Sequence, residues 1–494
     1  MRILSQGAFI AEKHSSTNML INNQLIDPVD LSKNLTWMFG KDTTSFPLSM
    51  MTEGNGFLKS VKPTVMNDTQ YKWNIIGRMK RTSMCKGLSG VNATPGLYTT
   101  PIKVIFEDKT FIKSYTLTSP DNLFQFYLMN DGNRLGANSY EYLLMPMNLK
   151  EGESVDLSNF TEGLYWVMGA PIIAAAKSDG TRSNSYTPGK LTNQFGYHRY
   201  SKGITGNIAN KVLNIELDAI DENNKSTKVN SWIPFEMAIF ERERRFLNEN
   251  DLWVSKYNRD NNGKIMLQDP DTGEDIPRGA GVFEQIDSVG NSDSYATLTL
   301  KKFDNTINAI YSNRDDDGPT EIILYTGRGG AREFHNAVMT DAIAHQYFTP
   351  LGDTQIGTAN GFLEYGAYFN RYKTIDGKII TVQVTSYFDK GPVAQMQLQN
   401  GDTIDGLARE SFTMVFLDHS VAEDGERNVQ LVAEAGREYQ VGIYKGMTPL
   451  PKEWGLSNDI RISDRKDVAY YEVIDSSGIA IKNVSTCFYL KKEL

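Results

Sequence analysis

The chain has 494 residues, 40% of them hydrophobic and 22% charged, which is typical of a globular protein with a core and excludes a disordered chain. This length allows two or three domains or one large discontinuous fold. A formal charge of −9 argues against general coating of nucleic acid. Residues 1–90 nevertheless contain eleven Lys/Arg and six Asp/Glu, a balance of +5.

The first part of the chain predicts an arm followed by strands. Residues 1–95 mix short apolar pieces with Asn, Thr, Ser and Gly, which favours an extended arm over a compact domain. Strands are predicted at 103–108, 123–130 and 140–148, and the last two flank the turn-rich DGNRLGANS, which indicates a long hairpin. Residues 177–210 are polar and glycine-rich without a helical or strand period. A loop of that length is generally functional or mobile.

A long amphipathic helix is predicted over residues 231–257. Asn230 or Ser231 can cap it, and Pro234 falls in its first turn. Apolar residues recur every seven positions, so a helix about 40 Å long should lie along a sheet or a neighbour. We expect the ERERR cluster at 241–245 to be its solvated face, with contact to a neighbouring subunit as the alternative.

The second half of the chain predicts a small α/β unit and further strands. The unit comprises a helix at 296–312, a strand at 320–326 and a helix at 330–346. A long hairpin is expected next, with arms of about 11 residues at 365–375 and 378–388 joined by Asp376 and Gly377. The remaining predicted strands are 412–418, 428–434, 439–444 and a terminal hairpin of 469–475 and 479–490 across the SSG turn.

The strand–glycine–helix pattern EIILYTGRGGAREFHNAV, residues 321–338, raises the question of a nucleotide site. A dinucleotide fingerprint needs a third glycine where Arg332 stands, and a P-loop needs Gly-Lys-Ser/Thr. Both are absent, so we interpret Gly327, Gly329 and Gly330 as residues of a tight, closely packed strand-to-helix turn.

A second stretch, NRDNNGKIMLQD at 258–269, partly follows the EF-hand pattern. Its first position, Asn258, lacks a carboxylate, and Asp269 stands where a bidentate Glu is wanted. Pro270 prevents an exit helix. We therefore favour an Asn/Gly turn over a calcium loop.

No other pattern predicts a reaction centre. His14, His198, His335, His345 and His419 are scattered, and His335 and His345 are too far apart on their helix for a shared metal. Carboxylate pairs such as Glu241 and Glu243 are interpreted as solvated. We therefore predict no catalytic residue, no cofactor-binding residue and no metal ligand, and a protein that is not an enzyme.

The compartment follows from the cysteines and the apolar runs. Cys85 and Cys487 form neither a disulfide framework nor a metal-binding spacing, which is typical of a reducing compartment. The start of the chain is a poor signal peptide. The longest apolar run, residues 164–176, is too short to cross a bilayer and contains Gly169 and Pro171. These features predict a soluble protein made in a cytoplasm, with no membrane partner.

Several segments together resemble one family. They are IFEDKTFIKSYTLTSPD (105–121), GEDIPRGAGVFEQI (273–286), YTGRGGAREF (325–334), GFLEYGAYFNRYKTIDGKIITVQVTSYFD (361–389), FTMVFLDHS (412–420) and SSGIAIKNVSTCFYL (476–490). In this order and spacing they resemble the major capsid protein of crAss-like tailed phages. The resemblance implies an α+β protein with the Hong Kong 97-type capsid fold. Residues 1–95 and 177–210 carry the least resemblance.

The resemblance also implies a division of the chain into parts. These are the N-terminal arm (1–95), the extended loop or E-loop region that lies over a neighbouring subunit (96–210), the peripheral domain with its spine helix at 231–257 (211–295), the axial domain (296–360), a long hairpin of the peripheral domain (361–389), a continuation of the axial domain (390–455) and C-terminal peripheral strands (456–494). Because the arm begins at Met1, we expect no cleaved scaffolding segment.

The function implied is self-assembly into the hexamers and pentamers of an icosahedral phage head that encloses double-stranded DNA. Expected partners are copies of itself, auxiliary or decoration capsid proteins, a portal, and DNA contacted non-specifically by groups such as Arg78, Lys80 and Arg81. The protein would be made in the bacterial host cytoplasm and reside in the virion. Alternatives are another virion structural protein, such as a decoration or tail component, a nucleotide enzyme using the 327–330 turn, and a glycan-binding surface protein.

Overall fold

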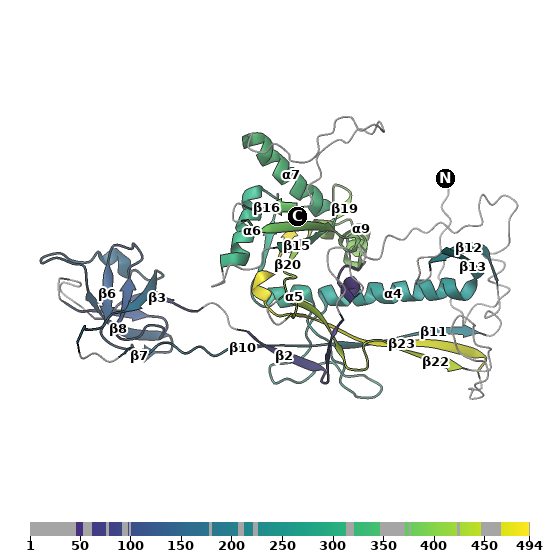
Figure 1. Ribbon diagram of the computed structural model, residues 1–494, viewed down its shortest axis with the longest axis horizontal. Helices are drawn as coiled ribbons and strands as arrows, with labels where there is room; N and C mark the ends of the chain where they lie inside the picture. The colour runs from purple at the N-terminus through teal and green to yellow at the C-terminus, as the bar shows by residue number, and fades with distance from the viewer. Residues whose placement is uncertain are drawn as a thin grey trace. The chain divides into compact units, whose positions relative to one another are not determined.

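The computed structural model describes residues 46–52, 62–75, 79–90, 97, 100–176, 180–205, 212–220, 226–312, 321–345, 371–374, 377–421, 425–445 and 466–493 (Figure 1). The chain divides into two compact units. Ile76–Gly189 is called the barrel unit, and Met1–Ile75 together with Lys190–Leu494 is called the body unit. Within the described ranges, no helix is both long enough and apolar enough to cross a membrane.

The barrel unit is a closed antiparallel sheet with one additional strand. Its elements are β3 (Thr82–Leu88), β4 (Ile102–Phe106), β5 (Tyr115–Thr118), β6 (Gln125–Leu128), β7 (Asn133–Gly136), β8 (Ser139–Pro146), the 3-10 turn η2 (Leu157–Phe160) and β9 (Tyr165–Pro171). The strands pair in the order β4-β3-β9-β5-β6-β8, and β8 pairs back with β4. β7 pairs with β8 outside this ring. Closure removes the open edges that a flat sheet of the same strands would expose.

Aromatic side chains fill the interior of the barrel. The Trp166 ring centroid lies 5.2 Å from that of Phe126 and 5.9 Å from that of Phe106, and Tyr142 packs edge-on against Phe106 at 5.7 Å. The indole Nε1 of Trp166 donates a hydrogen bond to the Asn159 carbonyl at 3.2 Å. Such a core buries large areas within one small unit.

The predicted hairpin of 123–130 and 140–148 is confirmed as the β6–β8 pair, in which Tyr127 lies opposite Met145. This region has a hydrophobic core of its own. The core residues come from strands dispersed between β3 and β9, so no single hairpin pattern reveals them. The expected loop DGNRLGANS also contains β7.

The body unit contains a six-stranded sheet that is buried on both faces. Its order is β14 (Ser292–Tyr295), β24 (Phe488–Lys492), β20 (Met414–Leu417), β15 (Glu321–Thr326), β17 (Ile379–Val384) and β16 (Arg371–Lys373). Along β15, Ile322 and Leu324 enter one hydrophobic core while Ile323 and Tyr325 enter the other. A strand whose side chains alternate between two cores is typical of a central strand covered on both sides.

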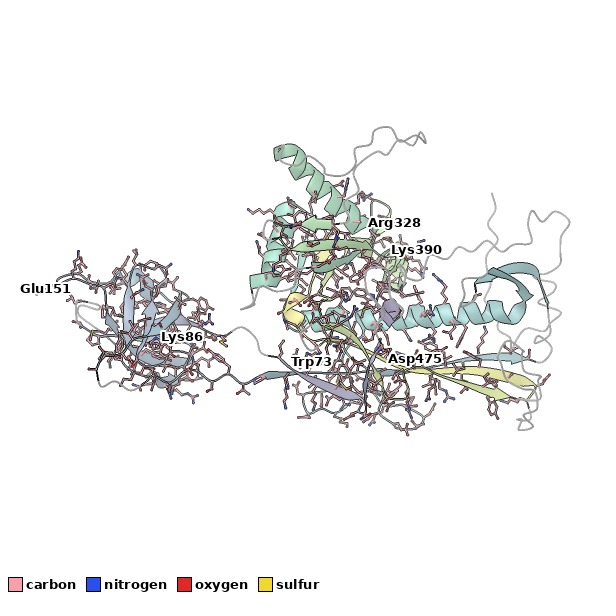
Figure 2. All side chains as sticks on the ribbon, in the orientation of Figure 1. Trp73, Lys86, Glu151, Arg328, Lys390 and Asp475 are labelled. Carbon is pink, nitrogen blue, oxygen red and sulfur yellow. The ribbon has the colours of Figure 1, made fainter. Side chains whose placement is uncertain are left out.

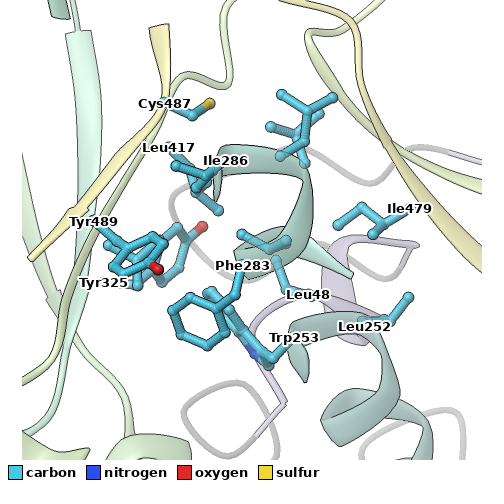
Figure 3. Close-up of a cluster of buried hydrophobic side chains, with 14 of the residues drawn as sticks. Leu48, Leu252, Trp253, Phe283, Ile286, Tyr325, Leu417, Ile479, Cys487 and Tyr489 are labelled. Atoms are coloured by element: carbon cyan, nitrogen blue, oxygen red, sulfur yellow. The ribbon is translucent and has the colours of Figure 1, made fainter. Parts of the chain in front are cut away.

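Helices cover the two faces of this sheet. Helices α6 (Leu300–Ser312) and α7 (Arg328–His345) contribute Phe303 and Phe334 to the first core. The second core, shown in Figure 3, contains Trp253 near the end of α4 and Phe283 from α5 (Val282–Asp287). The predicted α–β–α unit is therefore confirmed, with β15 between α6 and α7.

The long hairpin predicted around Gly377 is shorter than expected. β16 and β17 pair antiparallel, but β17 ends at Val384. Thr385 caps α8 (Ser386–Lys390), because its Oγ1 accepts a hydrogen bond from the Tyr387 amide at 3.3 Å. The expected arm to residue 388 is wrong, since Tyr387 and Phe388 enter the second core as helix residues. Residues 365–370, Ile375 and Asp376 lie outside the described residues.

A second sheet of the body unit is organised around one long strand, β23 (Val468–Ile481). It pairs with β11 (Gly196–Thr205), β21 (Val429–Glu434) and β22 (Gln440–Lys445), and β1 (Thr64–Met66) extends it beside β21. The terminal hairpin predicted across the SSG turn is wrong, because those residues lie inside β23. A Cβ on Gly478 would lie 2.9 Å from the Phe195 Cβ, so this glycine permits close packing and does not form a turn.

The expectation of a strandless segment over 177–210 is also wrong. It contains β10 (Gly189–Gln194) and β11, and all ten residues of β11 pair with β23. Polar residues on both faces of β11 hide the strand pattern that this pairing imposes. The predicted strands 412–418, 428–434 and 439–444 are confirmed as β20, β21 and β22.

The predicted long helix is confirmed as α4, Trp232–Val254 (Figure 1). Phe240 packs edge-on against Tyr471 of β23, with ring centroids 5.9 Å apart. The other described elements are η1 (Ser49–Thr52), β2 (Gln70–Ile75), β12 (Val212–Ile220), β13 (Ser226–Ser231), α9 (Pro392–Asn400), β18 (Thr403–Ile404), β19 (Leu407–Ala408), η3 (Arg409–Phe412) and η5 (Val484–Thr486).

Candidate functional site

The glycine turn after β15 presents the N-terminus of α7 to the protein's own side chains. The Arg328 amide donates to Asp389 Oδ1 at 2.9 Å, and the Gly329 amide donates to Ser411 Oγ at 2.8 Å (Figure 2 labels Arg328). Ser411 Oγ in turn donates to the same Asp389 oxygen at 2.6 Å. A carboxylate therefore occupies the position at which a phosphate would bind a helix N-terminus.

The glycines of this turn permit close packing, as the sequence indicates. A Cβ on Gly327 would lie 2.7 Å from the Ser411 carbonyl oxygen, and one on Gly329 would lie 2.8 Å from the Phe412 ring. A Cβ on Gly330 would lie 2.0 Å from Thr326 Oγ1. The steric interpretation is confirmed, and the crowding comes from η3 and neighbouring segments of the same chain.

The EF-hand-like stretch forms a turn stabilised by its own side chains. Asp260 Oδ1 accepts hydrogen bonds from the amides of Asn262 and Lys264 at 2.9 and 2.8 Å. Gly263 has a φ of 82°, which favours glycine. Asn258 Oδ1 accepts from Gln194 Nε2 at 2.7 Å. The predicted Asn/Gly turn is confirmed.

A network of charged side chains lies where α4 crosses the second sheet. His198 on β11 is held between two carboxylates from different elements. Its Nε2 lies 3.0 Å from Asp251 Oδ2 on α4, and its Nδ1 lies 3.2 Å from Asp475 Oδ1 on β23 (Figure 2 labels Asp475). One imidazole thus links helix to sheet.

Two arginines extend this arrangement. Arg244 of α4 donates to the other oxygen of Asp475 at 2.6 Å, and Arg278 donates to the other oxygen of Asp251 at 2.6 Å. His198, Asp251, Asp475, Arg244 and Arg278 are called the junction cluster. Because Asp475 and Arg244 are largely shielded from water, breaking their pair would leave an uncompensated buried charge.

Hydrogen bonding within the junction cluster keeps its histidine charged. Burial alone would lower the pKa of His198, but its hydrogen bonds to Asp251 and Asp475 outweigh burial and raise that pKa to about 9. Burial would likewise raise the pKa of Asp251, yet His198 and Arg278 hold it below its usual value. The cluster is thus a set of alternating charges at neutral pH.

The ERERR segment at 241–245 is therefore not simply a solvated face, and that expectation is wrong. Arg244 belongs to the junction cluster and also pairs with Glu241 at 3.0 Å, while Glu241 accepts from the Tyr439 hydroxyl at 3.0 Å. The Arg242 guanidinium lies 5.3 Å from the Phe46 ring centroid. Glu243 is exposed, as expected.

A buried carboxylate on α4 holds a separate segment of the chain. Glu249 Oε1 accepts from the Leu48 amide at 3.0 Å and from Trp253 Nε1 at 2.8 Å. Its Oε2 accepts from the amide and the hydroxyl of Ser49, both at 2.8 Å. Burial raises the pKa of Glu249, and these four donors oppose that rise. Glu249 thereby fixes residues 46–52 to the helix.

Sequence reasoning missed these residues, although one signal was present. Arg244, Asn248 and Asp251 are spaced i, i+4 and i+7, so they share one face of α4 next to the apolar stripe. Their partners His198 and Asp475 lie more than two hundred residues apart on β11 and β23. Only the strand pairing brings them together.

The remaining histidines and the cysteines do not form a site in the described part of the chain. His419 is buried, and burial lowers its pKa to about 3. His335 and His345 lie on α7, as predicted, while His14 lies outside the described residues. Among the described residues, no group of three His, Cys, Asp or Glu could hold a metal ion. Cys85 and Cys487 are both buried and unbridged.

In the sites above, the polar side chains bind other parts of the same chain and so stabilise its fold. The family model of the Crassvirus major capsid protein matches residues 12–494. The chain therefore belongs to the Crassvirus major capsid protein family. Its role is that of a major capsid protein, it self-assembles into a capsid, and its mixed sheets and helices form an α+β fold.

Several solved structures are similar to parts of the chain. A Mycobacterium phage Ogopogo structure has a TM-score of 0.33 and 11% identity, covering 66% of this chain and 83% of that chain. The satellite phage P4 procapsid has a TM-score of 0.29 and 9% identity, with coverage of 66% and 78%. The SrpI encapsulin of Synechococcus elongatus has a TM-score of 0.30 and 8% identity, with coverage of 62% and 75%. A search of curated proteins finds no match.

Proposed function

We propose that copies of this chain form the hexamers and pentamers of an icosahedral phage head that encloses double-stranded DNA. Membership in a major capsid protein family over residues 12–494 carries this proposal. The division into two compact units supports it, because each copy can then offer separate surfaces to different neighbours.

The test is assembly of the full-length chain, expressed alone and together with the scaffolding and portal proteins of its phage. Electron microscopy of the purified material should show capsomers or closed shells. A chain that stays monomeric at high concentration under every one of these conditions would contradict the proposal and favour another virion role.

We also propose the division into capsid-protein parts. The position of α4 supports its assignment as the spine helix of a peripheral domain at 211–295. The barrel unit, Ile76–Gly189, supports an E-loop region at 96–210 that lies over a neighbouring subunit. The six-stranded sheet unites strands of the proposed axial domain at 296–360 with strands from 361–389 and 456–494, so the axial and peripheral parts would share one sheet.

Contacts with packaged DNA, a portal and decoration proteins belong to the same proposal, as does synthesis in the bacterial host cytoplasm. Among the basic residues named for DNA contact, Lys80 is paired with Asp108, Arg81 is exposed, and Arg78 lies outside the described residues. The net charge of −9 supports weak contact, because packaged DNA must move against the shell.

We propose that the chain has no enzymatic activity. The competing function is a nucleotide enzyme that uses the 327–330 turn, and Asp389 argues against it because its carboxylate would repel a phosphate at the start of α7. Equilibrium binding of ATP and NAD at millimolar concentration tests this. Saturable binding that is lost in Gly329→Val would favour the enzyme.

A further inference from the structure

The longest apolar run of the chain, residues 164–176, lies at the surface of the barrel unit. Trp166 points into the barrel, but Tyr165 is 60% exposed and Val167 is 40% exposed. Leu164, Ile172 and Ile173 are exposed as well. These five residues, Leu164, Tyr165, Val167, Ile172 and Ile173, are called the apolar strip. Tyr165 and Val167 lie two positions apart and therefore face the same side of β9, and exposed apolar side chains that adjoin on one face favour an interaction site.

A partner can bind the apolar strip by packing on the face of β9 but not by pairing with its edge. β9 is paired on both sides, with Tyr165 opposite Met84 of β3 and Val167 opposite Thr118 of β5. Its backbone hydrogen bonds are thus satisfied within the barrel, which excludes the addition of a partner strand. A partner must therefore supply side chains that pack against the strip.

Charge favours the body unit of a second copy as that partner. Residues 76–189 contain eleven Lys/Arg and ten Asp/Glu, a balance of +1. Since the whole chain has a net charge of −9, the body unit has a net charge of −10. Net charge therefore disfavours contact between two body units more than contact between a barrel unit and a body unit. The run 164–176 itself contains no charged residue.

The body unit offers a matching surface on residues 258–276, called the acidic hairpin. It contains two successive antiparallel bridges, one between Arg259 and Ile265 and one between Gln268 and Asp275, and Met266 and Leu267 lie between them. Met266 is 67% exposed and Leu267 is 51% exposed. The hairpin contains two Lys/Arg and five Asp/Glu, a balance of −3, so it combines apolar side chains with a negative rim.

We propose that the apolar strip of one copy binds the acidic hairpin on the body unit of a second copy. This inference rests on the proposed self-assembly and names the surfaces that carry one of its contacts. The two surfaces differ, so the contact is heterologous and can repeat from copy to copy. It closes into a ring when the rotation between successive copies is a whole fraction of a turn. Such a contact belongs to the assembled state and leaves the fold of the single copy unchanged.

The first test is assembly of full-length variants beside the wild type. Tyr165→Ser with Val167→Ser, and separately Met266→Ser with Leu267→Ser, should each lower the assembled fraction about tenfold or more, since each pair removes two large apolar side chains from a contact. Leu123→Ser in the barrel unit and Met396→Ser in the body unit are matched controls, because both residues are comparably exposed and lie outside the two surfaces. Both controls should assemble normally.

The second test identifies the partner directly. A photo-crosslinking amino acid replaces Tyr165 in ¹⁵N-labelled protein, which is then assembled with unlabelled protein. Crosslinks should join labelled residue 165 to unlabelled peptides from 258–276. Crosslinks within one copy, between two barrel units, or to an auxiliary protein would overturn the proposal.

The outcomes separate the two levels of inference. Normal assembly of both double variants overturns the strip-to-hairpin contact and leaves the capsid function intact. A wild-type chain that fails to assemble under all conditions overturns both. Circular dichroism and thermal unfolding of the unassembled variants verify that a loss of assembly does not come from misfolding.

Discussion

Several glycines of this protein allow neighbouring atoms to pack closely against the backbone. Gly478 lies inside β23, and its neighbour Phe195 leaves no room for a methyl group. The sequence predicts a turn at Gly478, because it follows two serines. Glycine is favoured both in turns and where the backbone packs closely, so the residue type alone does not distinguish the two. The distinction needs the position of Phe195, which the sequence does not contain.

We therefore expect Gly478→Ala to lower the free energy of unfolding by about 1–3 kcal/mol, because the added Cβ would lie 2.9 Å from the Phe195 Cβ. Gly442→Ala on β22 is the matched control, since a Cβ there meets nothing within 4 Å. Urea unfolding of the unassembled proteins measures both. Equal stabilities of the two variants would contradict the packing argument.

His198 makes a prediction about pH. Its folded-state pKa of about 9 exceeds the usual 6.5, so the stability it contributes is fully present below pH 6.5 and is lost as the pH rises through about 9. The loss amounts to about 3 kcal/mol at most. Urea unfolding at pH 6, 7.5 and 9 should show this decline in the wild type and a flatter profile in His198→Gln. If the stabilities of the wild type and of His198→Gln changed with pH in parallel, the raised pKa of His198 would be contradicted.

At the scale of elements, the sequence predicts the three long helices well, but it predicts the short helices and the long-range strands poorly. α4, α6 and α7 appear where the apolar periodicity places them, because a helix closes its hydrogen bonds locally. β11 and β23 were missed or divided, because their pairing joins segments far apart in the chain. The junction cluster depends on that pairing, so its members could be identified on α4 but not matched to partners.

The attachment of residues 46–52 to α4 makes a prediction at this scale. Glu249→Ala removes the acceptor of the Leu48 and Ser49 amides and of the Trp253 indole. We expect hydrogen exchange at the Leu48 and Ser49 amides to accelerate about tenfold or more, since each buried hydrogen bond to a charged group contributes about 1.5–3 kcal/mol. Glu243→Ala, an exposed change on the same helix, should leave that exchange unchanged. Unaltered exchange in Glu249→Ala would contradict the anchoring role.

At the scale of the whole molecule, the two units have separate cores. The barrel was not predicted, because its ring closes through the β4–β8 pair and its interior draws on strands from 82 to 171. The capsid function, by contrast, followed from the order of short segments spread along the chain, which survives errors in individual strands.

Because the two units have separate cores, we expect a core mutation in one unit to unfold that unit alone. Trp166→Ala should destabilise the barrel unit by about 3–5 kcal/mol and leave the body unit folded. Limited proteolysis followed by mass spectrometry should then cut within 76–189 and spare the body unit. Tyr165→Ala is the control, because the neighbouring side chain faces outward. Simultaneous loss of both units would show that they fold as one.

The alternating side chains of β15 have a mechanical consequence for a particle built from this chain. Ile322 and Leu324 engage one core while Ile323 and Tyr325 engage the other, so neither layer of helices can slide without disturbing the other. Close-packed interiors transmit such strain and do not absorb it. In the DNA-filled head that we propose, we expect internal pressure to be borne by the body unit as a stiff plate, with any swelling of the shell taken up at the joints between copies.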